Sequence, residues 1–399
     1  MAMILALALS LVGPAHSQDF FSEIGPVVEL PTGGNWVRAY PEEAGWNLGL
    51  ATGVGYGILP LKPTGDGPSD WTVVEAERVW KVQQEDLADH NIKRCPDGSW
   101  LHIATGQVTS PDDSAWWFRH DRGWNLVASG IVELDNPNRH HSDPSVMCSA
   151  VGEGVLFAPK ASEPGDAVFF EVGSSGDAVP GPSTSKEPVP TGGALFTDVF
   201  TNEIHRLGVD GPAGNLVHVV YDSDWNELDR WSENPLPDPY FVYWPQGHIQ
   251  LGDYWILGTL GNTDPNGGGN SRRPFLVVYD SDWNAVAIEE VNAPGAGRPW
   301  IARRDNLLLM TFDNGLTPNL VGFELNLAAF GVDGANPDTG VNPEDFTGNG
   351  SDASDADDTG LSEDDKDGCG CSSGGSAGLL ALLVGALGAA RRRRTLPVD

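Results

Sequence analysis

Apolar and polar positions alternate in short runs along most of this chain, which is the period typical of β-strands with one buried face. The clearest run occurs twice, because residues 219–226 and 277–284 both read VVYDSDWN, 58 positions apart. In each copy an alternating strand leads into a tight turn at Ser-Asp, and a return strand follows. A looser copy, FRHDRGWN, lies at 118–125. The phrase therefore predicts a repeated β-hairpin and not a catalytic motif.

The turn of this hairpin has its own chemical signature. We expect the carboxylates of Asp222 and Asp280 to accept hydrogen bonds from the turn backbone. Trp225 and Trp283 are expected to fold back onto the hairpin. The looser copy has its Asp and Trp in the same positions.

A second pattern marks the strand that closes each unit. Its endings lie at 27–31, 74–80, 130–137, 168–179, 229–235 and 288–294, so that the units are about 50 residues long. This period, with several short strands per unit, is typical of a β-propeller. The inner strands are expected to start near Trp36, His90, Asp143, Ala194, Phe241 and Trp300.

The count of inner strands predicts an all-β fold, a six-bladed β-propeller over residues 18–330. The last unit, 298–327, has room for three strands only, and the segment 20–30 has a return-strand ending with no hairpin before it. We therefore expect the N-terminal strand to complete the last blade and close the ring. Five blades are the alternative if 138–185 is an insertion, and a two-sheet sandwich is a further one. In each case 173–193 is expected to be a long loop.

The two ends of the chain predict export. An apolar run from Met3 to Val12, followed by Ala15 and Ser17, is typical of a signal peptide over residues 1–17, although no basic residue precedes it. A buried N-terminal strand is the alternative. Residues 331–368 contain twelve acidic residues and one lysine, which predicts a disordered acidic stalk. This stalk is not expected to bind calcium as an EF-hand, because Lys366 stands where the loop needs a glutamate.

The C-terminal segment, 369–399, predicts a membrane anchor. An apolar stretch over 377–390 is just long enough for one transmembrane helix if the flanking small residues are included. A basic cluster follows it and favours a cytoplasmic tail. The cluster consists of Arg391, Arg392, Arg393 and Arg394, and the cysteines Cys369 and Cys371 precede the stretch, each after a glycine.

This order of Gly-Cys, short helix and arginine cluster resembles the myxobacterial C-terminal sorting signal, the MYXO-CTERM family, over about the last thirty residues. The resemblance implies export, processing near a cysteine by a sorting protease, and display at the cell surface. Either Cys369 or Cys371 matches the family cysteine. An ordinary C-terminal anchor in the membrane predicts the same topology.

The charge and the cysteines limit the function further. The net charge of −33, with no basic stripe outside the tail, excludes nucleic acid as a partner. Cys95 and Cys148 lie in neighbouring units and would meet an oxidising compartment after export. They are therefore expected to form a disulfide, with two buried thiols as the alternative.

The starts of the inner strands are the candidate functional positions, because propellers place function at one end of the central channel. Three hypotheses follow. In the first, oxygen ligands from successive blades hold calcium, as in six-bladed lactonases that share the architecture alone; the candidates are Asn91, Asp143 and Asp198. In the second, paired carboxylates hydrolyse a glycoside; the candidates are Asp89, Asp143 and Asp198, with Glu203 as the alternative to Asp198.

The third hypothesis is a sugar-binding or peptide-binding surface without turnover. Its candidates are Trp36, Arg38, His90, His141, Tyr240, Tyr243, Arg298 and Trp300. Each candidate also has a structural interpretation, since Asp often caps a turn, His often pairs with a neighbour, and Trp often packs between blades. No catalytic motif of known spacing occurs, and a fold does not by itself imply catalysis. We therefore expect a surface protein that binds an extracellular polysaccharide or protein, with a hydrolase as the alternative and a passive scaffold third.

Overall fold

The computed structural model describes residues 20–42, 45–52, 54–64, 71–82, 87–106, 115–132, 144–149, 152–157, 168–172, 178–183, 193–198, 200–211, 213–266 and 271–332. For 87–89, 106, 157 and 178–183 it describes the backbone alone. The predicted signal peptide, most of the stalk and the sorting segment lie outside these residues. No helix of the described part is long and apolar enough to cross a bilayer.

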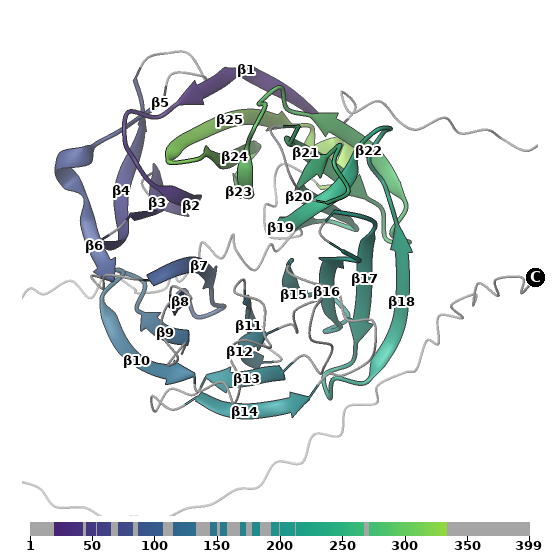
Figure 1. Ribbon diagram of the computed structural model, residues 1–399, viewed down its shortest axis with the longest axis horizontal. Coiled ribbons are helices and arrows are strands. Elements are labelled where there is room, and N and C mark those ends of the chain that lie inside the picture. Colours follow the sequence, from purple (N-terminus) through teal and green to yellow (C-terminus); the bar gives the residue numbers. More distant parts are fainter. Residues whose placement is uncertain are drawn as a thin grey trace, which may run out of the picture. The chain divides into compact units, whose positions relative to one another are not determined.

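Six antiparallel sheets form a ring, each with its first strand innermost (Figure 1). Blade 1 contains β2 (Asn35–Glu42), β3 (Gly45–Thr52) and β4 (Gly55–Pro63), with β5 (Trp71–Val73) and β6 (Val79–Val82) both paired to β4. Blade 2 contains β7 (Leu87–Arg94), β8 (Trp100–Gly106), β9 (Ala115–His120) and β10 (Leu126–Val132). Blade 3 contains β11 (Ser145–Ser149), β12 (Gly152–Phe157), β13 (Val168–Val172) and β14 (Ala178–Ser183).

The second half of the ring has the same plan. Blade 4 contains β15 (Leu195–Thr197), β16 (Ile204–Val209), β17 (Leu216–Tyr221) and β18 (Glu227–Glu233). Blade 5 contains β19 (Phe241–Leu251), β20 (Tyr254–Asn262), β21 (Arg273–Tyr279) and β22 (Ala285–Glu290). Blade 6 contains β23 (Gly297–Arg304), β24 (Leu307–Asn314), β25 (Thr317–Leu325) and β1 (Phe21–Glu29). The short 3-10 helices η2 (Glu75–Glu77) and η4 (Leu327–Phe330) complete the elements.

The predicted six blades and their closure are confirmed. β1 pairs with β25 in the order β1-β25-β24-β23, so the N-terminal strand completes the last blade. The segment 138–185 supplies blade 3 and is not an insertion. The expectation of a continuous loop over 173–193 is wrong, because 178–183 form β14. Its sequence, AVPGPS, lacks an alternating apolar pattern, which is why the strand could not be recognised.

The repeated phrase forms the turn between the third and fourth strands of its blade. In blade 4 the backbone N–H of Asn226 donates to Asp222 Oδ1 at 2.8 Å, and in blade 5 Asn284 donates to Asp280 Oδ1 at 2.8 Å. The tryptophan directly before this asparagine adopts a left-handed backbone conformation, with φ of 60° at Trp283. This conformation turns the indole back toward the sheet.

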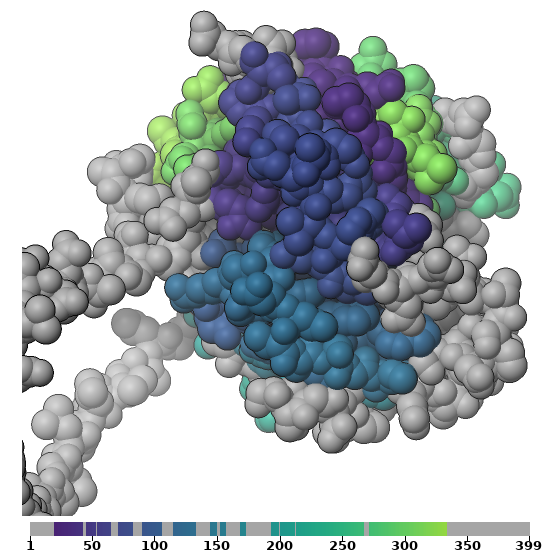
Figure 2. All heavy atoms as spheres, turned by 90° about the vertical axis from the view of Figure 1, so that its left-hand side faces the viewer, coloured from purple at the N-terminus to yellow at the C-terminus, as the bar shows by residue number. Residues whose placement is uncertain are grey.

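The tryptophan of each phrase packs against the preceding blade. Trp225 of blade 4 contacts Phe169 of blade 3, with ring centroids 4.6 Å apart. Trp283 of blade 5 contacts His218 of blade 4 at 4.0 Å. The phrase recurs because a ring of separate sheets needs the same contact at several blade boundaries, and each contact removes a large aromatic surface from water. Figure 2 shows the outer surface of two adjacent blades, 1 and 2, in purple and blue.

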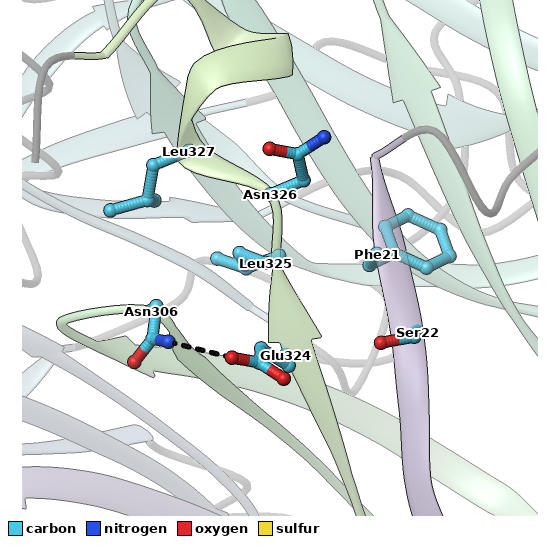
Figure 3. Close-up of a pocket in the computed structure, with 7 residues that line it drawn as sticks. All are labelled: Phe21, Ser22, Asn306, Glu324, Leu325, Asn326 and Leu327. Carbon is cyan, nitrogen blue, oxygen red and sulfur yellow. Dashed lines mark hydrogen bonds between the residues drawn. The ribbon is translucent and has the colours of Figure 1, made fainter.

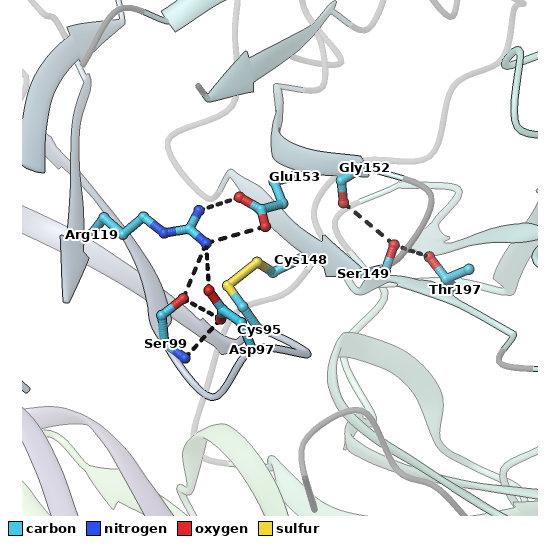
Figure 4. The surroundings of a disulfide bond; sticks show 9 residues. All are labelled: Cys95, Asp97, Ser99, Arg119, Cys148, Ser149, Gly152, Glu153 and Thr197. Carbon is cyan, nitrogen blue, oxygen red and sulfur yellow. Dashed lines mark hydrogen bonds and ion pairs between the residues drawn. A yellow bond between two sulfur atoms is a disulfide. The ribbon is translucent and has the colours of Figure 1, made fainter. Parts of the chain in front are cut away.

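The predicted disulfide joins Cys95, directly after β7, to Cys148 in β11 (Figure 4). It links the far ends of the inner strands of blades 2 and 3. Arg119 lies beside it and pairs with Glu153 and Asp97, so an ionic contact adds to the covalent one. The two blades are thereby held together at the end of the ring where their inner strands stop.

Candidate ligand-binding site

The inner strands all begin at one end of the ring, which we call the mouth. β2, β19 and β23, from three adjacent blades, each contain a β-bulge near this end. The register shifts lie between Asn35 and Arg38, between Tyr243 and Gly247, and between Gly297 and Trp300. A bulge re-aims the side chains around it and is often found next to functional sites.

Each of these bulges holds a bulky residue in a left-handed conformation. The φ angles are 53° at Trp36, 63° at Trp244 and 49° at Arg298. Such a conformation costs a residue with a Cβ about 1–2 kcal/mol. In the hairpin phrases the same conformation is explained by a tight turn, but these three residues lie inside strands. Strain of this kind, repeated at one end of the ring, indicates a functional constraint.

Asp313 of β24 holds two of the bulges together. Arg298 Nη1 donates to its Oδ1 and Oδ2 at 3.1 and 3.2 Å, and the backbone N–H of Trp36 donates to Oδ2 at 3.2 Å. Burial raises the pKa of Asp313 to about 6, and Arg298 opposes this rise. Because Asp313 is only 1% exposed, its carboxylate positions Arg298 and does not meet the solvent.

Aromatic rings surround the Arg298 guanidinium, which lies 4.9 Å from the ring centroid of Trp36 and 5.5 Å from that of Trp244. Trp244 meets Tyr243 edge-on at 5.7 Å, and the Arg272 guanidinium lies 4.8 Å from the Tyr243 ring. Tyr243, Trp244, Arg272 and Arg298 are half-buried, so they form the accessible part of the group. The mouth cluster consists of Trp36, Tyr243, Trp244, Arg272, Arg298 and Asp313.

Further along the inner strands, Arg38 connects three blades. Its guanidinium stacks on the Trp300 ring at 4.0 Å. Nη1 donates to Asn91 Oδ1, and Nη2 donates to the His90 carbonyl, both at 3.0 Å. Arg38 is 2% exposed, so it stabilises the ring from inside.

Lys93 spans the axis of the ring. Its Nζ lies 3.1 Å from His248 Nε2, and these residues belong to the opposite blades 2 and 5. Burial lowers the pKa of His248 well below its usual value, and the Lys93 charge lowers it further. The imidazole is therefore neutral, and its Nε2 accepts a hydrogen bond from the Lys93 ammonium. This bridge crosses the channel below the mouth cluster.

The aromatic and basic residues predicted from the sequence divide into three groups. Trp36, Tyr243 and Arg298 belong to the mouth cluster, and Arg38 and Trp300 lie below it. Tyr240 is set apart, because its hydroxyl donates to Glu290 Oε1 at 3.2 Å. His90 is fully buried, and its Nδ1 lies 2.9 Å from His102 Nε2, so a ligand at the mouth does not reach its ring. His141 lies outside the described residues.

The oxygen ligands predicted from the sequence are placed differently. Asn91 uses its Oδ1 for Arg38, and its Nδ2 donates to the Pro144 carbonyl at 2.9 Å. Asp198 follows β15 at the far end of the ring, where its Oδ1 accepts the Phe200 N–H at 2.8 Å. It caps a turn there because β15 has only three residues, which puts Asp198 past the strand and not at its start. Asp143 and the Asp89 side chain are outside the described part.

Among the described side chains, only Cys95, Cys148 and Glu153 bring three atoms of metal-ligating type within 4.8 Å of one another. Its cysteines are bonded to each other, so their sulfurs are not thiolate ligands. A pocket of 380 Å³ lies at the far end of the ring, between the start of β1 and the end of β25 (Figure 3). Glu324 in its wall accepts a hydrogen bond from Asn306 at 3.2 Å. This pocket is separate from the mouth cluster.

Three members of the mouth cluster were not predicted from the sequence. Trp244 is adjacent to a predicted residue, and its position inside a bulge depends on packing that the sequence does not reveal. Asp313 precedes Asn-Gly, which indicates a turn. Arg272 lies in the loop between β20 and β21. Neither Asp313 nor Arg272 lies at the start of an inner strand, because Asp313 reaches the mouth from the end of β24 and Arg272 from a loop.

No protein-family model and no curated protein matches this chain. Among solved structures, a protein of unknown function from Dyadobacter fermentans DSM 18053 is similar, with a TM-score of 0.54 and 10% identity over 77% of this chain and 99% of that one. A chain of a nidogen/laminin complex matches with a TM-score of 0.40 and 11% identity over 67% and 85% of the two chains. Hydrazine synthase from Kuenenia stuttgartiensis matches with a TM-score of 0.41 and 12% identity over 71% and 78%. At such identities the likeness concerns the fold alone.

Proposed function

We propose that this protein is an exported, surface-anchored β-propeller that binds an extracellular polysaccharide through the mouth cluster. The observation that carries the proposal is the set of three strained bulges, which bring two tryptophans and an arginine from adjacent blades to one point. Half-buried aromatic rings next to arginine suit the apolar face of a sugar and its hydroxyl groups. A protein partner is the alternative ligand, and a passive scaffold is the third function.

Binding of polysaccharides by the purified full-length protein in detergent tests this proposal. We expect saturable binding that weakens about tenfold in Trp244→Ala, because the change removes both ring area and a stacking contact. Trp80→Ala is the matched control, since Trp80 also stacks with an arginine, Arg78 at 5.2 Å, but lies on the outer strand β6. A panel of neutral and acidic polysaccharides that all fail to bind would refute the proposal, as would equal losses in the two variants.

Export and anchoring in this proposal rest on residues 1–17 and 369–399. Fractionation of cells that express the full chain tests them. We expect the protein in the surface fraction, and we expect replacement of Cys369 or Cys371 by alanine to leave the C-terminal segment unprocessed. A protein that stays in the cytoplasm with its first residues intact would contradict the prediction.

A calcium-dependent or glycoside-directed hydrolase remains the alternative prediction from Asp89, Asp143 and Asp198. Asp198 caps a turn at the far end, which separates it from the mouth cluster. Asp313 is the carboxylate of that cluster, and Arg298 holds both of its oxygens. We therefore favour binding over hydrolysis. Release of reducing ends from a bound polysaccharide would instead favour the hydrolase over a protein that only binds its ligand.

A further inference from the structure

Positive charge gathers at the mouth of a strongly acidic protein. The chain has a net charge of −33 and only 23 lysines and arginines. Arg272 and Arg298 belong to the mouth cluster, and Arg38 and Lys93 lie below it. Asp313 is the acidic member of the cluster and pairs with Arg298. The half-buried part of the cluster, which a ligand meets, contains the two guanidinium groups of Arg272 and Arg298.

Arg298 is oriented so that one nitrogen of its guanidinium group is left for a ligand. Both hydrogen bonds that it makes with the described residues come from Nη1, and both go to Asp313. Its Nε is buried and has no partner in the described part, as is also true of Trp244 Nε1. The Arg298 side chain is 25% exposed. Since Nε and Nη1 face inward, Nη2 is the nitrogen that a ligand can reach.

The rings next to these arginines determine what kind of anion fits. Tyr243 and Trp244 are half-buried, and each lies against a guanidinium, Arg272 at 4.8 Å and Arg298 at 5.5 Å. A sugar that carries a carboxylate offers an apolar ring face for the aromatic side chains and a planar anion for the arginines. A hydrogen bond from a guanidinium to a carboxylate is roughly twice as strong as one between neutral groups, so Nη2 of Arg298 favours a carboxylate over a hydroxyl group.

We propose that the ligand of the mouth cluster is a uronic-acid-containing polysaccharide, whose carboxylate is bound by Arg298 and Arg272 while its sugar ring packs on Tyr243 and Trp244. This inference rests on the proposed function and narrows its ligand class. The acidic surface elsewhere does not prevent such binding at physiological salt, because charges more than about 8 Å apart are largely screened there. An acidic peptide would satisfy the arginines but would leave the aromatic surface without a matching ring.

The test compares uronate oligosaccharides (galacturonate, glucuronate and mannuronate) with their carboxyl-reduced counterparts of equal length, using the full-length protein in detergent. We expect at least one uronate series to bind about tenfold or more tightly than its reduced form, since a hydrogen bond to a charged group contributes that much. Arg272→Gln should remove most of this preference. Arg298→Lys keeps the charge but loses the separate Nη1 and Nη2 donors, of which the first holds Asp313 and the second faces the ligand, and it should weaken uronate binding more than binding of the reduced form.

Arg304→Gln is the matched control, because Arg304 lies on the same strand as Arg298 but at its far end. It should leave the preference unchanged. Thermal unfolding shows whether each variant is folded, and Arg272→Gln remains informative if Arg298→Lys does not fold. Equal binding of acidic and reduced sugars would overturn the carboxylate inference and leave polysaccharide binding intact. Binding of neither kind would overturn both proposals, and binding of an acidic peptide alone would replace the polysaccharide with a protein ligand.

Discussion

Trp283 provides a test of how the repeated phrase stabilises the ring. Its indole is 9% exposed, and it packs on His218 at 4.0 Å and on Trp255 at 5.5 Å. Truncation of a buried aromatic side chain leaves a cavity, so Trp283→Ala should lower the free energy of unfolding by about 4 kcal/mol. Because the Trp283–His218 contact joins blade 5 to blade 4, the substitution removes packing between two blades as well as leaving a cavity in the core.

The backbone at Trp283 allows a sharper version of this test. With φ at 60°, alanine still carries the cost of the left-handed conformation, whereas glycine does not. Trp283→Gly should therefore be more stable than Trp283→Ala by about 1 kcal/mol. Trp255 is the control, since it is 4% exposed, lies within the regular strand β20 and stacks on the Trp283 indole. There glycine should be less stable than alanine by about 0.5–1 kcal/mol.

Urea unfolding of the four variants, followed by circular dichroism, measures both differences under identical conditions. The reasoning predicts opposite signs for the glycine–alanine difference at the two tryptophans. If glycine is the worse residue at both positions, the left-handed turn is not what determines the stability of the phrase. If Trp283→Ala costs less than about 1 kcal/mol, the indole does not connect the blades as described.

Three further predictions concern the whole ring. Burial lowers the pKa of four histidines, to about 4 at His120. Below pH 6.5 the unfolded state therefore binds more protons than the folded state, and the melting temperature should fall steadily between pH 6.5 and 4. Asp313, whose pKa is raised to about 6, has the opposite effect on stability, but a single group does not reverse the trend. The other three histidines are His102, His218 and His248. Replacement of both Cys95 and Cys148 by alanine should cost about 4 kcal/mol in urea unfolding, because the bond spans 53 residues, and an unchanged midpoint would contradict this. Deletion of residues 18–29 should expose the edge of β25 and produce oligomers in size-exclusion chromatography, whereas a stable monomer would show that β1 is dispensable.

Much of the fold could be predicted because its signals are local. The phrase VVYDSDWN contains its own strand, turn and packing residue, and its spacing gives the number of blades. The closure of blade 6 by residues 20–30 followed from a missing strand at one end and a spare one at the other. β14 was missed because a strand with two prolines and two small residues has no apolar pattern, and only its neighbours in blade 3 determine its pairing.

The candidate site was less predictable because it depends on where each strand bulges. An alternating pattern does not reveal the extra residue in β2, β19 or β23, although this residue decides which side chains reach the mouth. Thus the sequence pattern does not distinguish Trp36 and Arg298 from His90, which the structure buries between blades. Asp313 contributes from a second strand, and no sequence spacing links it to Trp36, 277 positions away.

The two ends of the described chain lie together at the far end of the ring. Phe330 packs on Phe20 with ring centroids 5.1 Å apart, and the N–H of Asn326 donates to the Phe20 carbonyl. If the protein is tethered through its C-terminal segment, as the sequence predicts, a tether at Val332 and a ligand at the mouth would pull on opposite ends of the same strands. The force would then run along β25 and β1, and their ladder of hydrogen bonds would be sheared as a set and not peeled apart one by one. A propeller loaded in this way would resist unfolding by a pulling force, because many β1–β25 hydrogen bonds would have to break at once.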